Sequence, residues 1–176
     1  QFGSNPNSKQ KKLYSTFLNY SNGKFKNLEE TIMITSDMPM SEFFKSDSNR
    51  KPTKDIYTRY IDFEAFKKID HNSIKFSWLG HSAFLLNIDG QLIMLDPMLG
   101  KYAAPIPLPK LKRYHSKTPL SLKDIDSIDA VIFSHDHYDH LDYSTIKNLT
   151  NKVKKYFVPH GLGNHLKSWG VKESLI

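Results

Sequence analysis

The polypeptide changes character at Ile74, where a polar segment gives way to short apolar runs of strand length. Three such runs follow one another closely, at residues 74–79, 83–88 and 92–95. Asp89 and Gly90 separate the last two runs, and this dipeptide favours the tight turn of a β-hairpin. The runs therefore predict a meander of antiparallel strands.

Strands and helices alternate in the second half of the chain. The expected elements are strands at residues 130–133 and 156–158 and helices at residues 141–149 and 163–169. Gly170 is suited to end the last of these helices. Residues 99–120 hold four prolines, which remove backbone donors, so this stretch is predicted to be a long loop. The order of elements predicts a mixed α/β class.

The first third of the chain has a different composition. Residues 1–59 are rich in Asn, Ser and Lys and are predicted to form an extended arm, with one short helix at residues 41–45, while residues 60–176 form the folded domain. The chain starts at Gln1, so a removed upstream signal or anchor is not excluded. No apolar run approaches the roughly 20 residues that cross a bilayer, and the expected location is cytoplasmic or membrane-associated.

Composition excludes several functions for these 176 residues. The absence of cysteine rules out disulfides, Cys-ligated zinc and a thiol nucleophile. The net charge of +7 is spread over both halves of the chain, so no nucleic-acid partner is expected.

Residues 134–142 contain the pattern His-x-His-x-Asp-His, formed by His135, His137, Asp139 and His140. Chance gives this pattern in about one chain in a thousand of this composition, so the signal is specific. Imidazole nitrogens and carboxylate oxygens are zinc ligands, and a loop between a strand and a helix is where open α/β sheets place their sites. The pattern therefore predicts a metal site, the alternative being a histidine-rich surface loop without chemistry.

The spacing within this pattern favours two metal ions. His135 and His137 lie two residues apart in a near-extended segment, so both can face one ion. Asp139 and His140 are adjacent at a helix start and can face a second ion. Two such ions can hold a hydroxide between them at neutral pH and clamp an oxyanion.

With this loop, the sequence resembles the metallo-β-lactamase superfamily. The resemblance implies the N-terminal half of a four-layer αββα sandwich, with two ions per complete site, usually Zn²⁺ but in principle another divalent metal. It makes His135 and His137 ligands of the first metal and Asp139 and His140 ligands of the second. Asp139 is then also the catalytic residue, because it orients the attacking water.

A narrower resemblance covers most of the chain. The fragments that carry it are residues 2–6, 19–27, 78–82, 95–97, 105–107, 112–114, 158–159, 161–163 and 169–170. In order and spacing they are similar to the N-acyl-phosphatidylethanolamine-hydrolysing phospholipase D family and its bacterial relatives. This resemblance implies phosphodiester hydrolysis of an N-acylated phospholipid by a metal-bound hydroxide. A small-molecule or lipid substrate and peripheral membrane contact follow from it.

Several residues outside the motif are candidates for supporting roles. Asp96 precedes a proline and is expected to be extended; by the resemblance it supports the metal loop through hydrogen bonds. His81 is either a residue of the cleft or a packed structural histidine, and the second role is favoured. His160 and His165 are not expected to be ligands, and Trp78 and Trp169 are expected in the core.

The resemblance also implies ligands that these residues do not supply. The sequence offers four of about seven, so we expect the N-terminal part of a longer enzyme, whose sheet alone exposes a large apolar face. The missing C-terminal half or self-association would cover that face. Two alternatives stay open: a hydrolase of the same fold acting on a sugar-phosphate lactone or a nucleic acid, and a non-catalytic fragment or interaction module.

Overall fold

The structure is a computed structural model that describes residues 2–32, 37, 39, 41–42, 45, 51–115 and 117–176. The chain divides into two compact units by its internal contacts. One unit comprises residues 6–54, and the other comprises residues 1–5 together with residues 55–176. Most of the short helix predicted at residues 41–45 lies outside the described residues.

The smaller unit contains a helix and a hairpin within the predicted arm. Helix α1 (Ser8–Tyr14) begins with a capping box, in which Asn7 and Gln10 each accept a hydrogen bond from the other's backbone. Strands β1 (Tyr20–Ser21) and β2 (Lys24–Phe25) pair antiparallel. Four aromatic rings pack together with centroid distances of 4.8–6.3 Å and form the apolar centre of this unit: Tyr14, Phe17, Tyr20 and Phe25.

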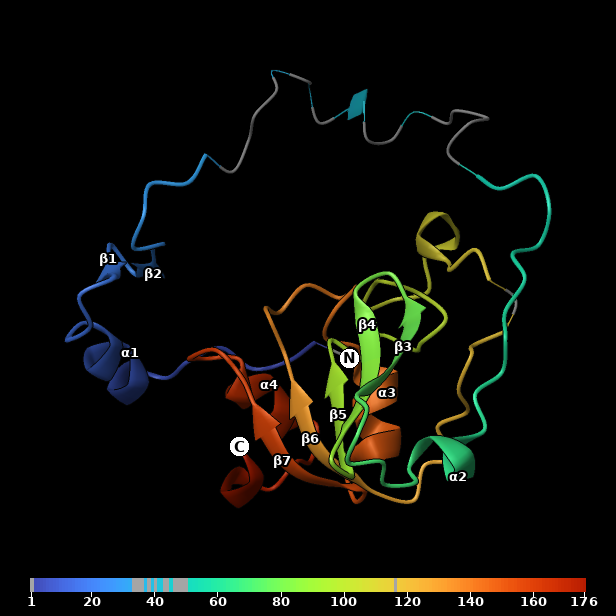
Figure 1. Cartoon of the computed structure of the whole chain (residues 1–176). Coiled ribbons are helices and arrows are strands. Elements are labelled where there is room, and N and C mark those ends of the chain that lie inside the picture. The colour runs from blue at the N-terminus through green and yellow to red at the C-terminus, as the bar shows by residue number, and fades with distance from the viewer. Residues whose placement is uncertain are drawn as a thin grey trace. The chain divides into compact units, whose positions relative to one another are not determined.

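The larger unit is built on one five-stranded sheet, shown in Figure 1. Its strands lie in sequence order: β3 (Lys75–Gly80), β4 (Ala83–Ile88), β5 (Gln91–Leu95), β6 (Ile128–Ile132) and β7 (Val153–Phe157). Strands β3 to β5 pair antiparallel, and β5, β6 and β7 pair parallel. The predicted meander and the mixed α/β class are confirmed. Strand β7 starts three residues earlier than predicted.

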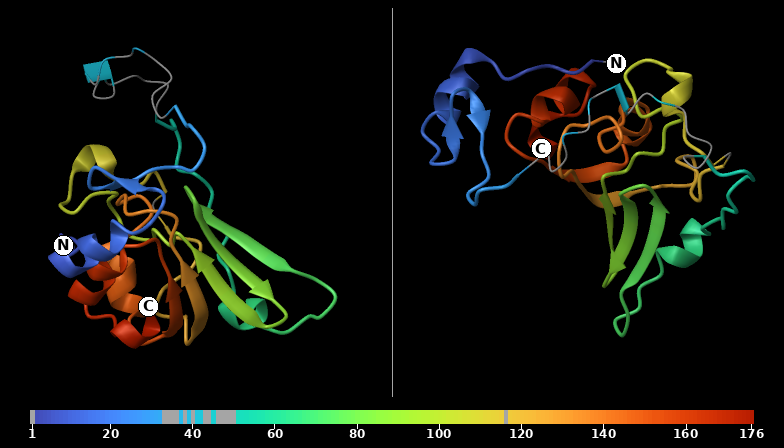
Figure 2. Two further views of the ribbon diagram at one scale, coloured as in Figure 1. Left: turned by 90° about the vertical axis from the view of Figure 1, so that its left-hand side faces the viewer. Right: turned by 90° about the horizontal axis from the view of Figure 1, so that it is seen from above.

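The helices of this unit are α2 (Phe63–Phe66), α3 (Tyr143–Leu149) and α4 (Gly163–Ser168), with 3₁₀ helices at Pro109–Leu111 and Glu173–Leu175. Helices α3 and α4 lie on the same side of the sheet, as Figures 1 and 2 show. Gly170, with a φ of 99°, follows α4 as predicted. Within the described residues, no helix has the length and apolar character to cross a membrane.

The two faces of the sheet differ in burial. The face towards α3 and α4 is closed, and side chains from four strands there are almost fully buried: Leu85, Met94, Val131 and Tyr156. On the other face, cross-strand pairing places one apolar residue of each strand in a continuous row: Trp78, Phe84, Leu95, Ile132 and Phe157. We call this second side the open face.

The open face corrects the prediction for one tryptophan. Trp78 is 58% exposed and Phe157 is 53% exposed, because no helix among the described residues of this unit covers their side of the sheet. Trp169, by contrast, is buried in the core, as predicted. The apolar face that the sequence led us to expect is therefore present on this unit.

Candidate metal centre

The His-x-His-x-Asp-His motif occupies the loop between β6 and α3, at the sheet edge where β5 and β6 end. This is the strand-to-helix position that the sequence predicted. The loop turns at His137, whose carbonyl accepts hydrogen bonds from the backbone N–H of His140 (3.0 Å) and of Leu141 (2.8 Å). The turn brings side chains of the second half of the motif back towards those of the first half.

Three imidazoles of the motif gather in this loop. The ring centroid of His135 lies 4.5 Å from that of His137 and 4.0 Å from that of His140. Asp139 lies beside them, with Oδ2 3.8 Å from Nε2 of His140. These contacts link four side chains of types that bind zinc, in the order His137, His135, His140 and Asp139.

His81 joins this group from the turn between β3 and β4. Its Nε2 lies 2.9 Å from Oδ2 of Asp139, and its ring centroid is 5.2 Å from that of His140. Ligand atoms of His81, Asp139 and His140 all lie within 4.8 Å of one another. The His81 side chain is 57% exposed, so the packed structural role favoured from the sequence is wrong.

The electrostatic environment of His135 favours its neutral form. Partial burial lowers the pKa of His135, and the neighbouring rings of His140 and His137 lower it further. A neutral imidazole has a lone pair for a metal ion, whereas a protonated one does not. The crowding of the motif therefore suits metal binding.

Asp96, at the end of β5, holds this loop through several hydrogen bonds. Its carboxylate accepts from the backbone N–H of Ser134 (2.7 Å), from the Ser134 hydroxyl (2.6 Å) and from Nδ1 of His140 (2.9 Å). Burial pushes the pKa of Asp96 upwards, but the hydrogen bonds from Ser134 and His140 outweigh it, so the pKa lies below its usual value. Asp96 is therefore ionised at neutral pH.

The backbone of Asp96 differs from the prediction. A residue before proline was expected to be extended, yet Asp96 has a φ of 40°, in the left-handed region. Its backbone N–H donates to the carbonyl of Ile132 at 3.0 Å, and its carbonyl accepts from Met98 at 2.7 Å. These bonds, with those of the carboxylate, outweigh the local preference, and such strain is typical of functional sites.

Two serines of the site were missed in the sequence. Ser134 bridges the motif, because its hydroxyl lies 2.9 Å from Nδ1 of His135 while it donates to Asp96. Ser82 lies 3.0 Å from Nδ1 of His140. The position of Ser134 directly before the motif was a usable signal, whereas the contact of Ser82 is visible only in the fold.

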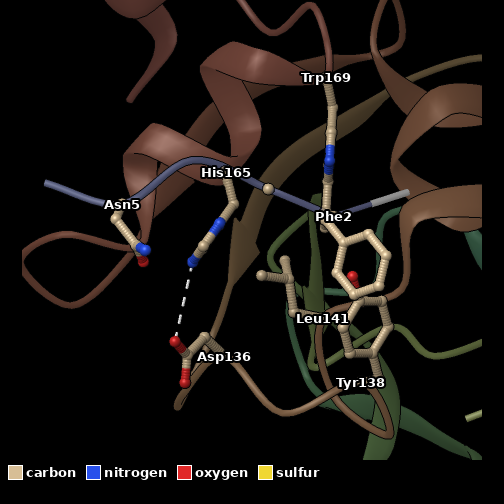
Figure 3. Close-up of a pocket in the computed structure, with 8 residues that line it drawn as sticks. Phe2, Asn5, Asp136, Tyr138, Leu141, His165 and Trp169 are labelled. Carbon is tan, nitrogen blue, oxygen red and sulfur yellow. Dashed lines mark ion pairs between the residues drawn. The ribbon is translucent and has the colours of Figure 1, made fainter. Parts of the chain in front are cut away.

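His160 and His165 lie outside this group. His160 is exposed. His165 is 3.7 Å from Asp136, and this pair lines a pocket of about 270 Å³ next to the N-terminal segment, shown in Figure 3. A Cβ at Gly3 would lie 1.8 Å from Nδ1 of His165, so only glycine fits there. The pocket uses Asp136 and Tyr138, the two residues that alternate with the ligand candidates in the motif.

Comparison with known proteins supports the resemblance to the metallo-β-lactamase superfamily. Residues 92–176 match the beta-lactamase superfamily domain. An uncharacterized protein of Mycobacterium tuberculosis is 35% identical over 164 residues, which cover 90% of this chain and 43% of that protein. N-acyl-phosphatidylethanolamine-hydrolyzing phospholipase D 1 of Caenorhabditis elegans is 37% identical over 97 residues, 54% of this chain and 27% of that protein. The predicted resemblance is thus confirmed.

Other matches are shorter. A UPF0173 metal-dependent hydrolase of Hyperthermus butylicus is 32% identical over 89 residues, covering 51% of this chain and 33% of that protein. Among solved structures, isothiocyanate hydrolase from Delia radicum gut bacteria aligns with 55% of this chain and 39% of its own at 21% identity, with a TM-score of 0.44. The chain spans less than half the length of these curated relatives and is similar to metal-dependent hydrolases.

Proposed function

We propose that this chain supplies the metal-binding loop of a hydrolase that cleaves a phosphodiester. The hydrolase uses two divalent metal ions, and zinc is the metal that we propose. The observation that carries the proposal is the gathering of His135, His137, Asp139 and His140 around a loop that Asp96 holds in place. Because these four side chains carry the donor atoms that zinc prefers, the residues fit the metal.

Each residue has a role that follows from its contacts. The carboxylate of Asp96 accepts a hydrogen bond from Nδ1 of His140. The ring proton therefore lies on Nδ1, which leaves Nε2 as the ligand atom. Ser134 fixes His135 in the same way, since its hydroxyl lies against Nδ1. Orientation of ligands by such partners is common in metal sites.

Asp139 has a double role in this proposal. Its carboxylate would hold a metal ion and would accept a hydrogen bond from the water that attacks the substrate, so that a lone pair of this water points at phosphorus. The metal ions, when bound, lower the pKa of water and stabilise charge on the phosphoryl oxygens. Asp139 is therefore the residue we propose as catalytic.

The proposed substrate is an N-acylated phospholipid. The support is the similarity to the Caenorhabditis elegans enzyme together with the ordered sequence fragments. A substrate of this kind lies in a membrane, so peripheral contact with a lipid surface belongs to the proposal.

The open face suggests how this unit is completed. Its apolar row crosses all five strands, and Phe76 beside it is 68% exposed. The matched relatives are more than twice as long as the segment they share with this chain. We propose that the open face packs against the part of a full-length protein that corresponds to the rest of these relatives. The remaining metal ligands would come from that part.

Metal analysis and activity on the full-length protein test the function. We expect about two zinc ions per chain, lost together with phospholipid hydrolysis on chelation. His160→Ala is the matched control, because this exposed histidine lies outside the motif loop, and it should keep both metal and activity. An active metal-free enzyme would contradict the proposal. If the full-length protein hydrolyses a lactone or RNA in preference to a phospholipid, the proposed metal site stands and the proposed substrate is wrong.

A further inference from the structure

The turn between β3 and β4 touches both candidate ligands in the second half of the motif. His81 in this turn reaches Asp139 through Nε2 at 2.9 Å, and the next residue, Ser82, reaches Nδ1 of His140 at 3.0 Å. Nearly 60 residues separate this turn from the motif in the sequence. The contacts therefore depend on the fold, and they converge on two adjacent side chains.

We propose that His81 is a positioning residue, whose Nε2–H holds the carboxylate of Asp139 in the orientation that a metal ion needs. The inference rests on the proposed function, because it takes Asp139 as a ligand. An ionised carboxylate can only accept a hydrogen bond, so Nε2 of His81 carries the proton in this contact. Nε2 of His81 therefore has no lone pair for a metal ion in this contact, and through this atom His81 acts on the site by way of Asp139.

The strained backbone conformation of His81 supports a functional role for its side chain. Its φ is 46°, in the left-handed region that side chains with a Cβ rarely adopt. The indole N–H of Trp78 donates to the carbonyl of His81 at 2.7 Å and holds the turn in this conformation. Glycine would relieve the strain, as it does at the preceding Gly80, whose φ is 109°. A histidine here costs stability, and its exposed side chain does not regain that stability by burial.

Three substitutions separate a positioning role from a structural one. His81→Leu removes the N–H donor, His81→Gln offers an amide N–H at a similar reach, and His81→Gly removes the donor together with the backbone strain. The measurement is titration of the metal-free full-length protein with Co²⁺, followed by the visible absorption of the bound ion. Thermal unfolding of the metal-free protein is recorded beside it.

We expect His81→Leu to weaken Co²⁺ binding about 10- to 100-fold and to change the absorption bands, as loss of a ligand's hydrogen-bond partner does. His81→Gln should restore most of the affinity. His81→Gly should bind Co²⁺ as weakly as His81→Leu, yet unfold at a higher temperature than the wild type. Asp89→Gly is the matched control, since Asp89 also has a positive φ (49°), in the next turn; it should leave Co²⁺ binding unchanged.

Each result decides between the proposals. Wild-type protein that binds no Co²⁺ overturns the proposed function and the role of His81 with it. Wild-type protein that binds Co²⁺ while His81→Leu binds it equally overturns only the role of His81. If His81→Gln fails to restore the affinity lost in His81→Leu, hydrogen-bond positioning is wrong and His81 is itself a ligand.

Discussion

The closed face of the sheet and the motif loop at its edge differ in the side chains that they hold and in how deeply these are buried. On the closed face, side chains such as Leu85, Met94 and Val131 are fully buried and contribute by packing alone. In the loop, imidazoles lie 4.0–4.5 Å apart, partly exposed, where they repel one another whenever two are protonated. The face stabilises the fold, whereas the loop carries the side chains that we propose for metal binding and catalysis.

Asp96 connects these two regions. It directly follows β5, and its side chain is 10% exposed. Through Ser134 and His140 it orders the motif without being part of it. The difference between the regions therefore predicts that metal binding and folding can be changed separately, except at Asp96.

The largest effect is expected in the loop. His135→Ala and Asp139→Ala each remove a proposed ligand, so the hydrolysis rate of the full-length protein should fall by about two to three powers of ten, with loss of metal. The midpoint of thermal unfolding of the metal-free protein should stay close to that of the wild type. A large fall in that midpoint would show that the loop contributes to the fold as the closed face does.

The second prediction compares two neighbouring leucines of β4 on opposite faces. Leu85 points to the closed face and is fully buried, so Leu85→Ala should lower the free energy of unfolding by about 2–5 kcal/mol. Leu86 lies on the open face and is only partly buried. Leu86→Ala in this 176-residue chain should cost less than half as much in urea unfolding. Equal losses would mean that the open face is covered in solution.

The strands could be predicted because their signal is local. Apolar runs bounded by a turn dipeptide mark β4 and β5, and the motif itself marks the loop after β6. The start of β7 was missed because Lys154 and Lys155 interrupt the apolar pattern, as charged residues do on an edge strand. Lys154 is accommodated there by an ion pair with Asp129 at 2.6 Å.

The errors concern residues whose environment is set by distant parts of the chain. Whether Trp78 is buried depends on what covers its face of the sheet, and no local pattern reports that. The left-handed φ of Asp96 depends on hydrogen bonds to Ser134 and His140, 38 and 44 positions away. The contact of His81 with Asp139 is of the same kind. The proposed ligands follow from their spacing and the support by Asp96 from the resemblance, whereas the contacts of His81 and Ser82 are visible only in the fold.

A third prediction concerns Asp96, where the two regions meet. Asp96→Asn keeps the size of the side chain, and asparagine tolerates a positive φ. Its amide nitrogen cannot accept the hydrogen bonds that Oδ2 accepts from Ser134 and His140. We expect metal affinity to fall about 10-fold or more, measured by Co²⁺ titration, together with a lower unfolding midpoint. If only the metal affinity changed, Asp96 would act on the motif loop alone. If only the unfolding midpoint changed, Asp96 would act on the fold alone.

The pH dependence of stability provides the control for Asp96. Its folded-state pKa lies below the usual value of 3.8, so its contribution is present above that pH and is lost as the pH falls through the folded-state pKa. Wild-type protein should lose stability below about pH 4, and Asp96→Asn should lose less over the same range. Identical acid profiles would exclude this carboxylate as a source of stability.

The smallest effect is expected at Tyr156, a polar exception on the closed face. Its hydroxyl is buried and has no hydrogen-bond partner within the described part of the chain, and burial raises its pKa to about 12 from 10.0. Tyr156→Phe removes the unpaired group and should leave stability at pH 7 unchanged or raise it by about 1 kcal/mol. Because the folded-state pKa is the higher one, wild-type stability should fall as the pH rises from 10 towards 12, and Tyr156→Phe should lack this part of the loss. Urea unfolding of both proteins at pH 7 and pH 10.5 measures the difference, and a variant less stable than wild type at pH 7 would show that the hydroxyl has a partner in solution.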